Sequence, residues 1–359
     1  MQAKSNSRAT GFTLSRILAF TILALLSLQT IVATAAPVSD AISVSGTTIL
    51  KGGKPWVPKG VVVDGLVVPA GAARGAYIGV RARFGENELD AISNFGADLI
   101  RFQVSQAGAA PQSNIYSSAY VDEVVRGVHM ARAHGFAVIL SMQSGRASGV
   151  DDPRGLPNDE TMRAWRNLAP RFAGDSGVML ELFNEPSRPK HRGGGGQEPS
   201  WAEWRDAHQP IIDEIRREGI HNVLIVDGLK FAKTLNGARG LSDPDASLIY
   251  AVHPYPQAHY SSEADWDEAF GDFAKTHPVL ATEWNVRVKG YCDPGFPEVA
   301  ASFLAYAKSH KIGVVGWSFD FPNTLFDSFG ALTSYKNFSC SSEGTWGVGE
   351  LLHGYFLKN

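Results

Sequence analysis

Residues 178–186 read VMLELFNEP, an apolar run that leads into Asn184 and Glu185. Residues 278–285 read PVLATEWN, a second apolar run, which leads into Glu283. Short apolar runs that end in polar residues are typical of buried parallel strands followed by loops. The carboxyl ends of parallel strands meet at one edge, so we expect both glutamates to lie at the same edge of one sheet.

Six further runs of this kind give eight in all. They are residues 60–63, 97–104, 136–142, 177–183, 222–226, 247–252, 278–282 and 312–319. Helical patterns lie between them, such as Val121, Val124 and Val128 ahead of Gly135. Eight strand-then-helix units predict a single (β/α)8 barrel. An open doubly wound sheet is the alternative, but no G-x-G-x-x-G turn follows the first run.

A β-hairpin is predicted before the barrel. Residues 47–51 and 54–58 are separated by Gly52 and Gly53, which suit a two-residue turn.

The first 35 residues have the pattern of a secretory signal peptide. Lys4, Arg8 and Arg16 are basic, no acidic residue is present, and residues 17–28 form an apolar stretch followed by an Ala-Thr-Ala tripeptide. A retained membrane anchor is the alternative, but polar residues interrupt the stretch before it reaches the length of a spanning helix. We expect a secreted or periplasmic protein.

The chain that remains after cleavage, residues 36–359, has no linker and is predicted to be one domain. It carries 30 basic and 36 acidic side chains, a net charge of −6. That balance does not suit a nucleic-acid partner, which needs a basic face. We expect a monomer that is free of the membrane after signal cleavage.

The two cysteines, Cys292 and Cys340, lie 48 positions apart. Metal ligands cluster at shorter spacing, so we expect a disulfide in an exported chain, with two free thiols as the alternative. We predict no metal and no cofactor.

Two glutamates at one rim match the needs of glycoside hydrolysis. One carboxyl must protonate the leaving oxygen, and the other must stay ionised to attack the sugar. The alternative for each is a solvated or ion-paired residue at the end of a strand.

At these residues the chain resembles glycoside hydrolase family 5, the cellulase-type members of a retaining (β/α)8 clan. Residues 182–186 resemble the acid/base motif of the family, and residues 282–284 resemble its nucleophile segment. The resemblance implies double displacement, with Glu185 as acid/base and Glu283 as nucleophile.

Further residues fall where the family places its substrate-binding groups. The resemblance implies this role for Arg101, for the pair His253 and Tyr255, and for Trp317 as a stacking platform. Asn184 is expected to bond the sugar 2-hydroxyl. Their alternatives are structural: an ion pair for the arginine and packed aromatic residues for the others.

One position departs from the family pattern. Gln143 stands where the family usually carries a histidine after the third strand, and an amide bonds a hydroxyl but cannot titrate. The departure leaves the mechanism intact and bears on substrate preference. Glu181 is expected to pair with a basic group, and Trp201 and Trp204 are expected to pack.

We expect an enzyme that acts on a polysaccharide, with endo-β-1,4-glucanase activity as the first choice. A β-mannanase and an exopolysaccharide-degrading or transglycosylating enzyme of the same clan are alternatives. A non-catalytic glycan-binding barrel is the alternative from another class, although it would be expected to lack one glutamate. A metal-dependent hydrolase would want closely spaced histidines, and none of the ten is spaced as His-x-His.

Overall fold

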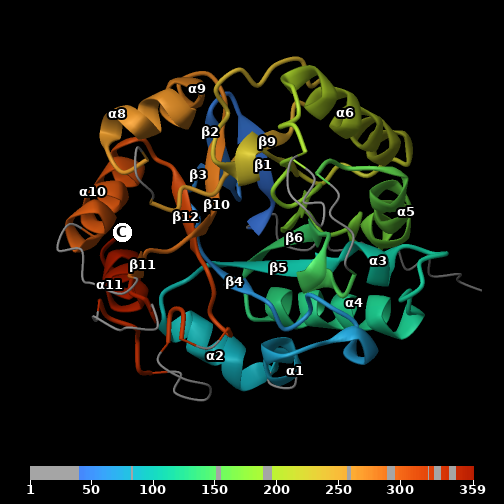
Figure 1. Cartoon of the computed structure of the whole chain (residues 1–359), viewed down its shortest axis with the longest axis horizontal. Coiled ribbons are helices and arrows are strands. Elements are labelled where there is room, and N and C mark those ends of the chain that lie inside the picture. Colours follow the sequence, from blue (N-terminus) through green and yellow to red (C-terminus); the bar gives the residue numbers. More distant parts are fainter. Residues whose placement is uncertain are drawn as a thin grey trace, which may run out of the picture. The chain divides into compact units, whose positions relative to one another are not determined.

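Eight parallel strands close into a barrel in the order in which they occur along the chain (Figure 1). They are β4 (Lys59–Val63), β5 (Leu99–Ser105), β6 (Ala137–Gln143), β7 (Val178–Glu181), β8 (Leu224–Asp227), β9 (Leu248–Val252), β10 (Val279–Trp284) and β12 (Gly313–Gly316). Each strand lies within a predicted apolar run or extends it by at most two residues. The predicted (β/α)8 barrel is confirmed.

The computed structural model describes most of the chain from Asp40 onward. The described residues are 40–81, 84–150, 155–188, 196–256, 260–288, 296–321, 323–326, 333–338 and 345–359. The predicted signal peptide and both cysteines, Cys292 and Cys340, lie outside these ranges, so cleavage and the disulfide stay predictions. No helix within the described ranges is long and apolar enough to cross a membrane.

Helices surround the barrel (Figure 1). The longer ones are α2 (Glu86–Asn94), α4 (Ser118–Ala133), α5 (Asp159–Leu168), α6 (Trp201–Arg217), α10 (Phe296–Ser309) and α11 (Gly349–Lys358). The shorter ones are α1 (Ala76–Arg81), α3 (Gln106–Ala109), α7 (Leu229–Ala232), α8 (Glu263–Trp266) and α9 (Asp272–Ala274).

The fifth unit differs from the predicted repeat. Between β8 and β9, where every residue is described, the only helical segment is the short turn α7, in which Lys230, Phe231 and Ala232 have φ of 57°, 62° and 55°, in the left-handed region. Gly237 and Gly240 follow this turn with φ of 96° and 79°, a conformation that continues no right-handed helix.

The strands bury side chains on both faces, which explains their continuous apolar runs. One set of alternate residues packs outward against the helices, as Ile100 and Phe102 do. The other set fills the interior of the barrel. This inner layer includes Val62, Leu99, Ile139, Met179, Ile225, Ala251, Leu280 and Val315.

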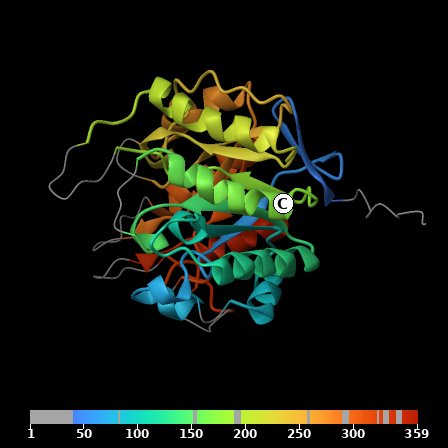
Figure 2. The ribbon, with the colours of Figure 1, turned by 90° about the vertical axis from the view of Figure 1, so that its right-hand side faces the viewer.

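A small antiparallel sheet precedes the barrel and lies at one end of it (Figure 2). The predicted hairpin is present as β2 (Thr48–Lys51) and β3 (Lys54–Pro55), and β1 (Ile42–Ser45) adds a strand that the sequence did not predict. Ile42 and Ile49 pack into the inner apolar cluster of the barrel. The sheet therefore closes the amino-terminal end of the barrel interior.

We expect Ile49→Ala to lower the free energy of unfolding by about 2–5 kcal/mol, because it leaves a cavity in this closure. Ile49 is only 6% exposed. Thermal denaturation measures the loss, and kcat/KM at 25 °C should not change. Val57→Ala, at a residue that is 37% exposed, is the control. Equal loss in both variants would contradict a closing role for the sheet.

Candidate active site

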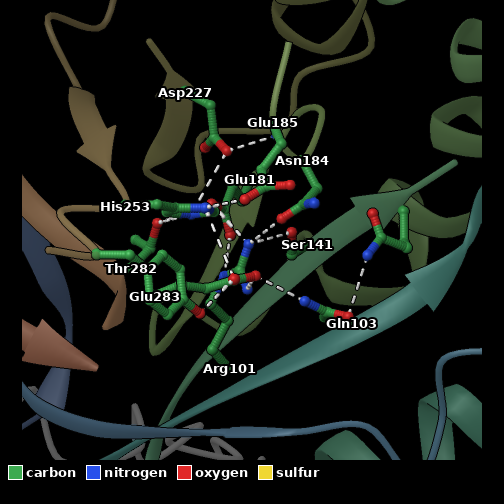
Figure 3. A network of polar contacts seen from close by, with 12 residues as sticks. Arg101, Gln103, Ser141, Glu181, Asn184, Glu185, Asp227, His253, Thr282 and Glu283 are labelled. Atoms are coloured by element: carbon green, nitrogen blue, oxygen red, sulfur yellow. Dashed lines mark hydrogen bonds and ion pairs between the residues drawn. The ribbon is translucent and has the colours of Figure 1, made fainter. Parts of the chain in front are cut away.

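Polar side chains follow the inner apolar layer toward the carboxyl ends of the strands. Side chains alternate along a strand, so the residue two positions after an inner one faces the same way. Leu99 is thus followed by Arg101 and Gln103, and Met179 is followed by Glu181. Figure 3 shows the polar network that results. Its labelled members are Arg101, Gln103, Ser141, Glu181, Asn184, Glu185, Asp227, His253, Thr282 and Glu283.

Arg101 lies at the centre of this network, with a fully buried side chain. Its Nε and Nη2 donate to the two carboxylate oxygens of Glu181, at 2.5 and 3.0 Å. Nη1 donates to Glu283 Oε1 at 2.7 Å. Nη2 also donates to Ser141 Oγ and to Asn184 Oδ1, both at 2.8 Å. The planar guanidinium therefore fixes two carboxylates and one amide relative to each other.

Glu181 is held ionised inside the barrel. Burial alone would raise the pKa of its carboxyl, but the Arg101 guanidinium, together with a hydrogen bond from Asp227 and the nearby His253, brings that pKa to about 2. The expected ion pair between Glu181 and a basic group is present.

Glu283 accepts three hydrogen bonds and is only 5% exposed. Oε1 accepts from Arg101 and from Gln103 Nε2, both at 2.7 Å, and Oε2 accepts from the Tyr255 hydroxyl at 3.0 Å. Burial and the charge of Glu283 raise the pKa of Tyr255, so its hydroxyl keeps the proton that it donates. The pairing of β10 with β12 is irregular between Ala281 and Trp284, at the position of Glu283.

Glu185 directly follows Asn184 in the sequence and lies opposite Glu283. Its side chain is 30% exposed. Its φ of 56° is in the left-handed region, which few residues other than glycine adopt. Its backbone N–H donates to Asp227 Oδ2 at 2.9 Å. This bond fixes the backbone of Glu185 at the point where the side chain turns into the barrel mouth.

His253 connects Glu185 with the buried ion pair. Thr282 Oγ1 lies 3.0 Å from Glu181 Oε1 and 3.0 Å from His253 Nε2. An ionised Glu181 only accepts, so the Thr282 hydroxyl donates to it and accepts from Nε2–H. His253 Nδ1 then faces Glu185 Oε1 at 3.0 Å. In the neutral ring this nitrogen accepts, which suits a Glu185 that carries a proton.

Asp227 accepts the hydrogen bond from the backbone of Glu185 and is fully buried. Burial and the charge of Glu181 raise the pKa of the Asp227 carboxyl well above its usual range. Asp227 is therefore a neutral acid, whose hydroxyl donates toward Glu181 while Oδ2 accepts from the backbone of Glu185.

Asn184 has a fixed orientation. Its amide oxygen accepts from Arg101, which leaves the amide nitrogen as the group that can donate toward the barrel mouth.

Partly exposed aromatic rings line the side of the mouth next to Glu283. The ring of Trp317 lies 5.4 Å from that of Trp346 and 5.6 Å from that of Phe321, and the rings of Trp346 and Tyr255 are 5.9 Å apart. Trp346 belongs to β13 (Thr345–Trp346), which pairs with β11 (Arg287–Val288). These rings offer flat apolar faces beside the carboxylates.

Two trios of side chains have donor atoms close enough to meet at one ion. In Glu185, His253 and Glu283 these atoms all lie within 4.8 Å of one another, and the same holds for Glu181, Asp227 and His253. Most of the oxygens involved already accept from the buried guanidinium, a hydroxyl or a backbone N–H. The positive charge that a cation would supply is already present, so the donor set fits a hydrogen-bonded network.

The structure brings together all eight residues that the sequence assigned to the site, whose chemical roles stay predictions. They are Arg101, Gln143, Asn184, Glu185, His253, Tyr255, Glu283 and Trp317. Trp204 is fully buried, as expected, and its Nε1 donates to the Asp227 carbonyl at 2.8 Å while Trp201 packs against its ring.

Several members of the site were not predicted. Gln103, Ser141 and Thr282 lie two residues after inner positions, and Asp227 ends the fifth barrel strand. These placements identify such residues only once the inward face of each strand is known, and a run that is apolar on both faces does not show it. Trp346 has no comparable signal in the sequence.

A closed (β/α)8 barrel with a polar site at the carboxyl ends of its strands is the architecture of the barrel enzymes. The family model described as cellulase (glycosyl hydrolase family 5) matches residues 83–322, so this chain belongs to glycosyl hydrolase family 5.

Among curated proteins, a mannan endo-1,4-beta-mannosidase of Cellvibrio japonicus is 24% identical over 266 residues, which cover 71% of this chain and 56% of that protein. Endoglucanase C of Evansella cellulosilytica is 22% identical over 272 residues, which cover 68% of this chain and 32% of that protein. The chain thus spans about half of the first relative and about a third of the second.

Among solved structures, a beta-glucanase from Saccharophagus degradans in complex with cellotetraose has a TM-score of 0.65 at 22% identity, covering 89% of this chain and 94% of that one. A catalytic domain of a Thermobifida fusca endoglucanase has a TM-score of 0.60 at 21% identity, covering 90% and 100%. These similarities show that the fold is shared.

We expect Asp227→Asn to match the wild type in melting temperature near pH 4 and to exceed it at pH 8. The raised pKa of Asp227 means that its contribution to stability is full below the unfolded value of about 4 and is lost as pH rises through the folded value. Asparagine keeps both hydrogen bonds and cannot ionise. The gain should approach about 1.4 kcal/mol for each pH unit over the range of titration.

Asp243→Asn is the control with the opposite sign. Burial alone would raise the pKa of Asp243, but Arg216 lowers it, so this variant should lose stability at neutral pH and recover as pH falls. A melting difference for Asp227→Asn that stays constant with pH would contradict a neutral carboxyl at position 227.

Proposed function

We propose that the protein is a retaining glycoside hydrolase that cleaves a β-linked polysaccharide by double displacement. The observation that carries this proposal is the spacing of the two glutamates, whose facing oxygens lie within 4.8 Å. Retaining enzymes hold their carboxyl groups about 5–5.5 Å apart, whereas inverting enzymes leave about 6.5–9.5 Å for a water molecule. The spacing of the facing oxygens supports the shorter, retaining separation.

In the first step Glu283 attacks the anomeric carbon of the sugar. A bond forms between a carboxylate oxygen and that carbon, and the glycosidic bond breaks with its electron pair going to the leaving oxygen. Glu185 gives its proton to that oxygen. The tautomer of His253 and the donors around Glu283 keep one glutamate as the acid and the other as the anion before the substrate binds.

In the second step Glu185, now ionised, takes a proton from water, and the oxygen of that water forms a bond to the anomeric carbon. The ester bond to Glu283 breaks and returns its electron pair to the carboxylate. The amide nitrogen of Asn184 is placed to bond the 2-hydroxyl, a contact that strengthens as positive charge develops on the sugar. Trp317 supplies an apolar face for the ring.

We propose that the substrate is a β-1,4-glucan and that the enzyme cleaves it internally. Relatives named endoglucanases and a beta-glucanase structure that holds cellotetraose support this choice. Mannan is the second candidate, because a mannan endo-1,4-beta-mannosidase is among the relatives. Transfer of the sugar to another glycan uses the same residues and is distinguished by the products.

We also propose that residues 1–35 direct export to the periplasm or the medium and are removed. Residues 36–359 then act as one monomeric catalytic domain, stabilised by a disulfide between Cys292 and Cys340. This proposal rests on the sequence pattern and on the oxidising compartment to which it leads.

The stereochemistry of cleavage tests the mechanism. We expect the first product that NMR detects from a β-glucan oligosaccharide to be the β anomer, because two inversions restore the configuration. Initial release of the α anomer would refute double displacement.

Two variants assign the roles in the same assay. Glu185→Ala should lower kcat roughly 10²–10⁴-fold on substrates with poor leaving groups. With azide and an activated aryl glycoside it should form a β-glycosyl azide. Glu283→Gly with azide should form the α-glycosyl azide, because the anion occupies the space of the lost carboxylate. Exchanged outcomes would exchange the roles of the glutamates, and full activity in either variant would exclude the mechanism.

Viscometry tests the substrate. We expect the protein to lower the viscosity of carboxymethyl cellulose or barley β-glucan faster than it releases reducing ends, because internal cuts shorten chains most. The Glu283→Gly variant is the inactive control. Cleavage of mannan with no action on either glucan would replace the glucanase proposal, and release of monosaccharide alone would exclude endo action.

A further inference from the structure

Two glutamines form a hydrogen-bonded chain that ends on Glu283. Gln103 lies on β5 two residues after Arg101 and is 4% exposed. Gln103 Nε2 donates to Glu283 Oε1 at 2.7 Å. Gln143, the last residue of β6, donates from its Nε2 to Gln103 Oε1 at 3.1 Å. Gln143 is partly exposed, at the mouth of the barrel.

The direction of this chain follows from the group at its end. An ionised Glu283 has acceptors and no donor, so Gln103 must turn its NH2 group toward it. The amide oxygen of Gln103 then faces the opposite way and must receive a donor, which is the NH2 group of Gln143. The amide oxygen of Gln143 is therefore left at the open end of the chain. Each amide orientation is assigned by the hydrogen bond before it.

We propose that Gln103 is a positioning residue for Glu283, that Gln143 fixes the orientation of Gln103, and that the Gln143 oxygen accepts a hydrogen bond from a hydroxyl of the bound sugar. This proposal rests on the proposed glycosidase function and goes beyond it by naming the polarity of one substrate contact. A sugar hydroxyl that contacts the amide oxygen of Gln143 must donate to it.

The chain also selects the oxygen of Glu283 that attacks. Oε1 accepts from two buried donors, Arg101 and Gln103, whereas Oε2 accepts from Tyr255 alone. Oε2 is the freer oxygen and forms the bond to the anomeric carbon. Oε1 becomes the carbonyl oxygen of the ester and keeps both donors, so the chain remains bonded throughout the first step.

The test compares Gln103→Met, Gln143→Met and the double variant. Methionine keeps most of the side-chain volume and offers neither a strong donor nor a strong acceptor. The first readout is kcat/KM on the preferred glucan as a function of pH. The second is the melting temperature from pH 3 to pH 8, which does not depend on activity.

We expect Gln103→Met to lower kcat/KM roughly 10- to 100-fold, as for a lost hydrogen bond to a charged group. The acid limb of the pH profile should move to higher pH, because the lost bond favours the ionised carboxylate. Gln143→Met should move the acid limb in the same direction by less and should also raise KM. The double variant should show the acid limb of Gln103→Met, because both residues act through one chain.

The melting temperature should show the same dependence on the charge of Glu283. The deficit of Gln103→Met at pH 7 should shrink as the pH falls, because the hydrogen bond from Gln103 is strongest when its acceptor is charged. Gln106→Met is the control for loss of a buried glutamine, since Gln106 bonds Glu160 and Thr161 and does not contact Glu283. It should leave the pH profile of kcat/KM in place.

The outcomes separate this proposal from the proposed function. An unmoved acid limb in Gln103→Met, or additive shifts in the double variant, would contradict the proposed hydrogen-bonded chain from Gln143 through Gln103 to Glu283. A melting deficit of Gln103→Met that does not vary with pH would overturn it as well. A wild type that cleaves no β-glycan, together with a deficit that shrinks toward pH 3, would refute the hydrolase and support the bond between Gln103 and Glu283.

Discussion

The guanidinium of Arg101 places a permanent positive charge inside a barrel that excludes water, and such a charge is stable only when ionised and polar acceptors surround it. Glu181 meets this need on one side and Glu283 on the other. Because Glu181 must then be an anion, the Thr282 hydroxyl points toward it and His253 presents its protonated nitrogen to Thr282. The state of the ring that faces Glu185 is thus set by an arginine that it does not touch.

The single positive charge of Arg101 limits how many carboxyl groups inside the barrel can be ionised. One arginine faces Glu181 and Glu283, so a third buried anion would be opposed by two like charges and by burial. Asp227 avoids this conflict by keeping its proton, which makes it a donor to one neighbour and an acceptor for the backbone of another. The protonated carboxyl there is bonded to both neighbours and holds the backbone of Glu185 in place.

The sequence predicted the features that depend on pattern along the chain. The eight strands followed from continuous apolar runs, Glu185 and Glu283 followed from their positions at strand ends, and Arg101 followed from the resemblance to the family. Gln103 and Thr282 depend on which face of the strand is inward, and a run that is apolar on both faces does not reveal this. The neutral state of Asp227 arises from neighbours that are distant in sequence, so only tertiary structure determines it.

The left-handed backbone of Glu185 has a consequence for how this site persists. An ordinary residue held in that conformation costs stability, and glycine or asparagine would occupy the position with less strain. Selection for folding alone would therefore replace this glutamate. Its presence marks a position where activity and stability compete, and loss of selection for activity should be visible first as drift at residue 185, while the barrel itself stays intact.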